Sequence, residues 1–179
     1  MKRATYRLRQ FLSGFTARIT PADHLLLDEI LSGEQRQLFG RMPADAQRHS
    51  LNVLHELRNA GHNSADLAVA ALLHDVGKVA ASDAGAYLGL WLRGPMVLIE
   101  KFAPWLLPKF ASSQPSKSWR YAIYVQLAHP QIGAKWAVDA GCTPLSCWLI
   151  EHHQYEQVDY AESQQLALLE ALQWADNQN

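Results

Sequence analysis

The sequence predicts an all-α protein, and three observations favour this fold class. No segment shows a sustained alternation of apolar and polar residues, which would indicate a half-buried strand. Apolar residues instead recur at spacings of three and four, as they do along one face of a helix. The breaks between segments carry helix signals: a capping Ser, Thr or Asn before a segment, proline at its first position, or glycine after its end.

The first helices belong to a predicted N-terminal extension, residues 1–42. A short amphipathic helix is expected up to about residue 14. A stronger helix should cover residues 21–31, because Thr20 can cap it and a proline stands at its first position. One or two further turns are expected at residues 35–39.

The next helix should run from Pro43 to about Ala60 and end at Gly61. It carries His49. Asp45 precedes His49 by one turn, and its carboxylate can serve as a further metal ligand or simply favour the helix N-terminus. One face of this helix is apolar, through Leu51, Leu54 and Leu57.

A following helix, capped by Asn63 or Ser64, is apolar and alanine-rich and ends in an adjacent histidine and aspartate. It delivers His74 and Asp75 to a place that should be buried. Buried polar groups need partners, so other residues with suitable chemistry should lie nearby. Gly77 should free the backbone to turn and to approach a ligand closely.

Residues 85–118 differ from the rest of the chain, because glycines and prolines punctuate a run of large apolar side chains. A membrane span needs about 20 uninterrupted apolar residues, and this run contains Arg93, Glu100, Lys101 and Lys109. It should therefore not span a membrane. A lid over the site, a partner surface, an interfacial membrane element and ordinary core and loop all remain open.

The next part of the chain should form two helices that meet at a proline. The first is expected from Trp119 to Leu127 and leads to His129. Pro130 should begin the second, which runs to about Ala140, because proline is favoured at the first position of a helix.

Two more helices should complete the chain. Thr143 can cap the first of them, which ends in His152 and His153 and so repeats the pattern of an apolar helix delivering polar groups. Ser163 can cap the second. On this last helix Asp176 continues an apolar stripe, an unusual place for a carboxylate without a partner.

Composition excludes some classes of function and predicts a location. The 16 basic and 17 acidic residues leave a net charge of −1, so there is no strong nucleic-acid signal. Cys142 and Cys147 do not amount to a disulfide framework; packed or free thiols in a reducing compartment are expected. The basic N-terminus lacks the apolar core of a signal peptide. We therefore expect a cytoplasmic protein.

The residues with metal-binding chemistry share a position at or near the ends of predicted helices. They are His49, His74, Asp75, His129, His152, His153 and Asp176. Converging helices that present imidazole and carboxylate groups commonly hold metal ions. This donor set suits Mn, Fe, Co, Ni or Zn, as one or two ions. Asp75 is the natural bridge between two ions, which together would generate a hydroxide and clamp a phosphate group.

The order of these residues resembles a known family. His49, then His74-Asp75, then Asp176 is similar to the H…HD…D signature of the HD-domain metal-dependent phosphohydrolases, which are all-helical. His-Asp-Val-Gly-Lys at 74–78 resembles the HD-Ile-Gly variant. His129-Pro130 and His152-His153 resemble the extended set of the two-metal branch, which includes the HD-GYP phosphodiesterases of cyclic di-GMP. The Gly-Tyr-Pro loop of those enzymes is absent here.

The resemblance implies an HD-domain helical bundle at residues 43–179, with a Trp/Pro-rich helical insert at about 85–118. It implies a first metal held by His49, His74, Asp75 and Asp176, and a second held by Asp75, His129 and either His152 or His153. Asp75 would serve catalysis, and Lys78 would contact the phosphate group.

The implied function is a phosphomonoesterase or phosphodiesterase that acts, through a metal-activated hydroxide, on a small-molecule phosphate ester such as a nucleotide or signalling nucleotide. The alternative is a non-catalytic metal-binding helical module that docks a protein partner or a membrane through the segment at 85–118.

Overall fold

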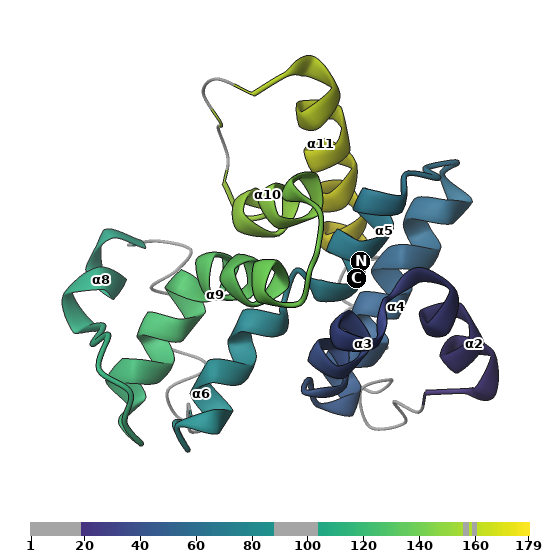
Figure 1. Ribbon diagram of the computed structural model, residues 1–179. Coiled ribbons are helices and arrows are strands. Elements are labelled where there is room, and N and C mark those ends of the chain that lie inside the picture. Colours follow the sequence, from purple (N-terminus) through teal and green to yellow (C-terminus); the bar gives the residue numbers. More distant parts are fainter. Residues whose placement is uncertain (1–18, 88–103, 156–157, 159–160) are drawn as a thin grey trace, which may run out of the picture.

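The computed structural model describes residues 19–87, 104–155, 158 and 161–179, and within these ranges every regular element is a helix. The predicted all-α class is therefore confirmed (Figure 1). The short helix expected before residue 14 lies outside the described residues. So do residues 88–103, which make up most of the first half of the predicted insert, and most of the loop at 156–160.

Three helices open the described chain. Helix α2 (Pro21–Ile30) begins with a capping box, in which Thr20 and Asp23 exchange hydrogen bonds, as the sequence predicted for Thr20. Helix α3 (Gly33–Gly40) has a similar box at Ser32. Helix α4 (Ala44–Asn59) follows Pro43 and stops before Gly61, whose φ of 87° is in the left-handed region favoured by glycine.

The apolar helix α5 (Ala65–Leu73) is capped by Ser64. The remaining elements are the 3₁₀ turn η2 (Val76–Lys78), α6 (Val79–Asp83), the 3₁₀ turn η3 (Pro104–Leu106), α8 (Leu107–Phe110), α9 (Trp119–Asp139), α10 (Pro144–His152) and α11 (Ser163–Gln178). Thr143 caps α10 as predicted. The N-cap of α11 is Glu162, so Ser163 is its first residue instead of its cap.

One expected boundary was wrong. The two helices predicted at 119–127 and from Pro130 onwards are a single helix, α9, with Pro130 in its interior. A proline removes the backbone hydrogen bond to the carbonyl four residues earlier, which is usually enough to break a helix. Here that carbonyl, of Gln126, has another partner: Nδ1 of His129 lies 2.8 Å from its oxygen. The side chain replaces the missing backbone donor, and the helix continues.

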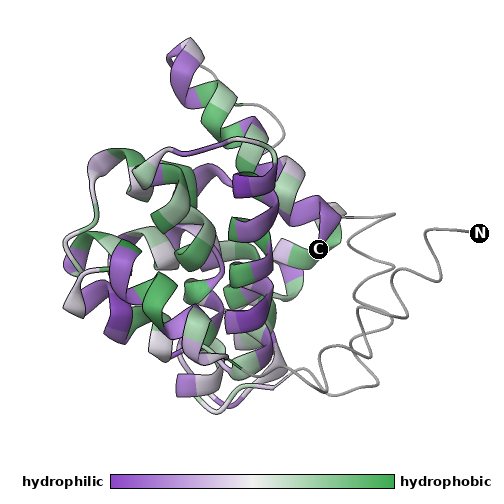
Figure 2. Ribbon diagram, turned by 90° about the vertical axis from the view of Figure 1, so that its right-hand side faces the viewer, coloured by the Kyte–Doolittle hydropathy of each residue, from purple (hydrophilic) through white to green (hydrophobic). Residues whose placement is uncertain are grey.

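The main core is built around α5, which contacts α4, α10 and α11 (Figure 1). Most of its apolar residues are buried against apolar faces of these neighbours: Leu67, Ala70, Ala71, Leu72 and Leu73. Most helices carry both hydrophobic and hydrophilic residues, as amphipathic packing requires (Figure 2). Leu27, Leu38 and Phe39 of α2 and α3 belong to the same core. The boundary proposed at residue 42 stays a prediction.

A partly buried ion pair joins α2 to α4. Arg48 donates to Asp23 across 2.5 Å, and Asp23 also accepts hydrogen bonds from the backbone and hydroxyl of Thr20. Burial alone would raise the pKa of Asp23, but the hydrogen bonds from Arg48 and Thr20 hold it well below its usual range.

We therefore expect Asp23→Asn to lower the free energy of unfolding by about 2 kcal/mol at neutral pH. A carboxylate whose pKa is lowered by folding stabilises the protein above its unfolded pKa of about 4 and loses that effect as pH falls below it. The difference between wild type and variant, measured by denaturant unfolding, should thus shrink towards zero in acid. A difference that stays constant down to strongly acidic pH would contradict this account.

Two further expectations concern the cysteines and the membrane. Cys142 and Cys147 are both free thiols, as expected, and burial raises the pKa of Cys142 to about 11. Among the described residues, no helix is both long enough and apolar enough to cross a membrane.

Candidate metal centre

Six of the seven residues predicted to bind metal lie together where five helices and a turn converge. His49 comes from the middle of α4, and His74 and His153 stand directly after the last residues of α5 and α10. Asp75 precedes the turn η2. His129 projects from the interior of α9, and Asp176 from near the end of α11.

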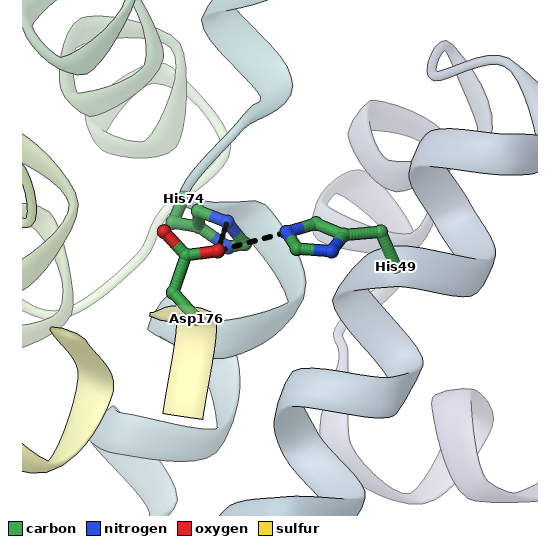
Figure 3. Close-up of side chains that lie close together, drawn as sticks. All are labelled: His49, His74 and Asp176. Carbon is green, nitrogen blue, oxygen red and sulfur yellow. Dashed lines mark ion pairs between the residues drawn. The ribbon is translucent and has the colours of Figure 1, made fainter. Parts of the chain in front are cut away.

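The first group consists of His49, His74 and Asp176 (Figure 3). Oδ1 of Asp176 lies 2.9 Å from Nε2 of His49 and 3.6 Å from Nε2 of His74. The carboxylate of the last helix therefore reaches between two imidazoles that come from α4 and α5. His74 is fully buried, whereas His49 and Asp176 are partly exposed.

The second group consists of Asp75, His129 and His153, all of them buried. Oδ1 of Asp75 lies 3.4 Å from Nε2 of His129 and 3.9 Å from Nε2 of His153. The two Nε2 atoms are 3.3 Å apart. Three ligand atoms from three different elements thus face one another.

Asp75 connects the two groups. Its Oδ2 is 3.7 Å from Nε2 of His74, while its Oδ1 faces His129 and His153. The imidazole rings form a continuous row, with centroid distances of 5.4 Å from His49 to His74, 5.1 Å from His74 to His153 and 5.2 Å from His153 to His129. One carboxylate can therefore serve both groups, one oxygen to each.

Lys78 lies beside this carboxylate. Its Nζ is 2.7 Å from each oxygen of Asp75, and its side chain is partly exposed. The turn η2 places Lys78 three residues after Asp75, so both side chains project from the same side of the chain. An ammonium group at the open edge of a buried cluster can contact both the carboxylate and a bound anion.

The hydrogen bonds of the three buried histidines decide which nitrogen faces the centre. Nδ1 of His74, His129 and His153 lies 3.0, 2.8 and 2.7 Å from a backbone carbonyl oxygen. A carbonyl oxygen only accepts, so Nδ1 must donate and, in the neutral ring, Nε2 carries the lone pair.

These lone pairs point at other acceptors. Nε2 of His74 has no hydrogen-bond partner although it is buried between two carboxylates, and Nε2 of His129 faces Nε2 of His153 and an oxygen of Asp75. Acceptors that face one another in a buried place repel unless a cation or a proton lies between them. The residues present therefore fit a metal ion in each group, and imidazole with carboxylate is a donor set that metals bind.

The electrostatics of the cluster keep its carboxylates charged. Burial alone would raise the pKa values of Asp75 and Asp176, but the neighbouring histidines, and Lys78 beside Asp75, hold both far below their usual range. Burial lowers the pKa of His153 to about 3. Burial would also lower the pKa of His74, but the charges of Asp75 and Asp176 raise it. At neutral pH the carboxylates are thus charged and His153 is neutral, the forms that bind metal.

The seventh predicted ligand, His152, lies apart from both groups. Its Nδ1 donates to the carbonyl of Trp148, and its ring stacks on that tryptophan with centroids 4.6 Å apart. It also makes an edge contact with the ring of Tyr155, with centroids 5.1 Å apart. Of the two adjacent histidines, the geometry brings His153 to the centre. Asp45, the open alternative, is exposed and belongs to neither group.

Gly77 does not adopt a positive φ, so the turn there does not depend on the backbone freedom that glycine alone has. Its Cα packs against the backbone of α9. A Cβ atom at this position would lie 2.1 Å from the carbonyl oxygen of His129 and 2.7 Å from the nitrogen of Gly133. The turn that carries Asp75 and Lys78 is therefore packed directly on the backbone that carries His129.

Three carbonyl groups orient the buried histidines, those of Ala71, Gln126 and Ile150, and none of them was predicted from the sequence. Every residue has a backbone carbonyl, so the sequence does not show which carbonyls accept a hydrogen bond from a side chain. The only signal was Pro130, a proline directly after a histidine, which we interpreted as a helix start.

Comparisons with known proteins identify no relative: no family model, no curated protein and no solved structure matches this chain.

Proposed function

We propose that this chain is a metal-dependent phosphohydrolase of the HD-domain type, which cleaves a phosphomonoester or phosphodiester of a small molecule such as a nucleotide or signalling nucleotide. The observation that carries the proposal is the position of Asp75, one oxygen of which faces His74 while the other faces His129 and His153. A carboxylate shared between two groups of ligands is the arrangement on which two-metal phosphate chemistry depends.

In this proposal His49, His74 and Asp176 would hold one divalent metal, His129 and His153 would hold a second, and Asp75 would contribute to both. Bound in this way, transition metals supply Lewis acidity and lower the pKa of a coordinated water to near neutrality. The burial of His74, Asp75, His129 and His153 supports the proposal, because a dry site strengthens the electrostatic interactions on which this chemistry relies.

The chain's own residues would do the remaining work. The row of imidazoles fixes the relative positions of the two groups, since three of the four rings are oriented by backbone carbonyls. Lys78 is partly exposed beside Asp75, so its ammonium can pair with a phosphoryl oxygen and stabilise charge that develops there. The sequence order H…HD…D, which resembles that of the HD-domain enzymes, agrees with these roles.

Two adjacent histidines provide a matched test. His153→Ala should remove a ligand of the second group, so metal content should fall by about one ion per chain and phosphatase or phosphodiesterase turnover by about 100-fold or more. His152→Ala, one residue away and stacked on Trp148, should retain both within a few fold. Elemental analysis and turnover of an aryl phosphate and a nucleotide panel give the readouts.

The opposite result, loss of metal with His152→Ala and retention with His153→Ala, would contradict the assignment of ligands. Fully metal-loaded wild-type protein with no turnover of any phosphate ester tested would contradict the enzymatic function.

A second candidate, a non-catalytic metal-binding module that docks on an anionic membrane, rests on the described end of the predicted insert. Trp105, Phe110 and Trp119 are 65, 45 and 40% exposed. Basic residues accompany them and acidic ones do not: the charged residues at 104–120 are Lys109, Lys117 and Arg120. Exposed aromatic side chains with cations suit a headgroup layer. Co-sedimentation with anionic but not neutral vesicles, together with no turnover, would favour this candidate.

A further inference from the structure

Pro130 stands where a proline should be unfavourable. Helix α9 runs from Trp119 to Asp139, so Pro130 lies in its interior. In an α-helix the carbonyl of each residue accepts from the N–H four residues later. Proline has no N–H, and the carbonyl of Gln126 is therefore left without its backbone donor.

The imidazole of His129 takes the place of that donor. Its Nδ1 is 2.8 Å from the oxygen of Gln126. Because the carbonyl can only accept, Nδ1 carries the hydrogen, and Nε2 is directed with its lone pair towards Nε2 of His153 at 3.3 Å and Oδ1 of Asp75 at 3.4 Å.

The other two buried histidines are also oriented by a backbone carbonyl, but this carbonyl is free for a different reason. Nδ1 of His74 meets the carbonyl of Ala71, and Nδ1 of His153 meets that of Ile150, each three residues earlier in the chain. Both histidines directly follow the last residue of a helix, α5 or α10. The carbonyls of a last helical turn have no partner within the helix, so they are free to accept from a side chain.

His129 has no such helix end within reach, because α9 continues to Asp139. We infer that Pro130 is a positioning residue for His129: it frees the carbonyl of Gln126 within an unbroken helix, and this carbonyl holds the imidazole with Nε2 in the second group of ligands. The inference rests on the metal-binding part of the proposed function and does not depend on turnover.

Pro130→Ala tests the inference. Alanine restores the N–H that competes for the Gln126 carbonyl, so the imidazole of His129 should lose its fixed orientation. Long-range ¹H–¹⁵N spectra of the metal-free full-length protein in mildly alkaline buffer report which ring nitrogen carries the hydrogen. Wild type should show His129 protonated at Nδ1 alone, and the variant should show a mixture of both tautomers.

Metal titration supplies the second readout. The second ion should bind Pro130→Ala about 10- to 100-fold more weakly, as is typical when the hydrogen bond that orients a ligating histidine is lost. The first ion, at His49, His74 and Asp176, should bind as in wild type. Pro144→Ala is the control, because Pro144 occupies the first turn of α10, where a missing N–H costs nothing.

Several outcomes would overturn the inference. One is a folded Pro130→Ala protein with unchanged tautomer and unchanged affinity for the second ion, as expected if the proline only shapes the packing of α9. Another needs no variant: wild-type His129 protonated at Nε2 contradicts it even if Pro130→Ala does not fold. Wild-type protein that binds two ions with the expected tautomer but turns over no phosphate ester would contradict the enzymatic function and leave this inference standing.

Discussion

Asp75→Asn is expected to abolish turnover, lowering it by about 1,000-fold or more, and to reduce the metal content at both groups. The reason is that, among the six described residues of the cluster, Asp75 is the one whose carboxylate faces both groups: Oδ2 lies 3.7 Å from Nε2 of His74 and Oδ1 lies 3.4 Å from Nε2 of His129. An amide keeps the shape of the side chain, but it removes the negative charge and replaces one oxygen by a hydrogen-bond donor. No other single substitution in the cluster weakens both groups directly.

Elemental analysis and phosphate release, each on purified metal-loaded protein, measure the effect. Asp83→Asn is the matched control, because Asp83 is exposed on α6 and pairs with Arg41 away from the centre. This control should keep its metal and its activity. An Asp75→Asn protein that retains two ions per chain and near wild-type turnover would rule out the shared carboxylate as the basis of the chemistry.

The same cluster shows what could be predicted from the sequence and why. His74 and Asp75 stand out because an apolar helix carries them to a buried place, where only a partnered polar group is stable, and Asp176 stands out because it continues an apolar stripe on the last helix. That argument needs no three-dimensional information beyond helical periodicity. It singled out Asp176, which lies about 100 positions from Asp75 in the chain, as a carboxylate in need of a partner, and the resemblance to the HD-domain enzymes then implied which residues meet.

Other features of the site could not be predicted from local patterns. His152 and His153 are chemically identical neighbours, and only the packing of α10 decides that one faces Asp75 while the other stacks on Trp148. Pro130 was interpreted by its most common role, as a helix start, because the sequence does not show that a side chain can replace the missing donor. Tertiary and side-chain contacts decide which histidine faces the centre and what Pro130 does, and local sequence propensities carry no information about such contacts.

Gly77 is a third such case, and it gives the largest expected effect on stability. The residue is a glycine because two backbones meet there: a Cβ atom would lie 2.1 Å from the oxygen and 2.9 Å from the carbonyl carbon of His129, and 2.7 Å from the nitrogen of Gly133. All three atoms belong to the backbone of α9, so no rotation of a side chain can relieve the overlap. The turn η2 and the helix α9 would have to separate.

We expect Gly77→Ala to lower the free energy of unfolding by about 3 kcal/mol or more, measured by denaturant unfolding of the metal-free protein. Gly40→Ala provides the matched control, because Gly40 ends α3 with ordinary backbone angles and a Cβ there would meet nothing within 4 Å. That variant should differ from wild type by about 1 kcal/mol at most, and the change should be stabilising. Equal stability of the two variants would contradict the close approach.

The two substitutions at 75 and 77 distinguish the loss of a metal ligand from the loss of the packing that positions the ligands. Asp75→Asn removes a ligand and leaves the contact between η2 and α9 in place, so the metal-free protein should stay folded while its metal is lost. Gly77→Ala leaves every ligand in the chain, but by separating η2 from α9 it should move Asp75 away from His129. Where that variant still folds, it should therefore bind the second ion more weakly than the first.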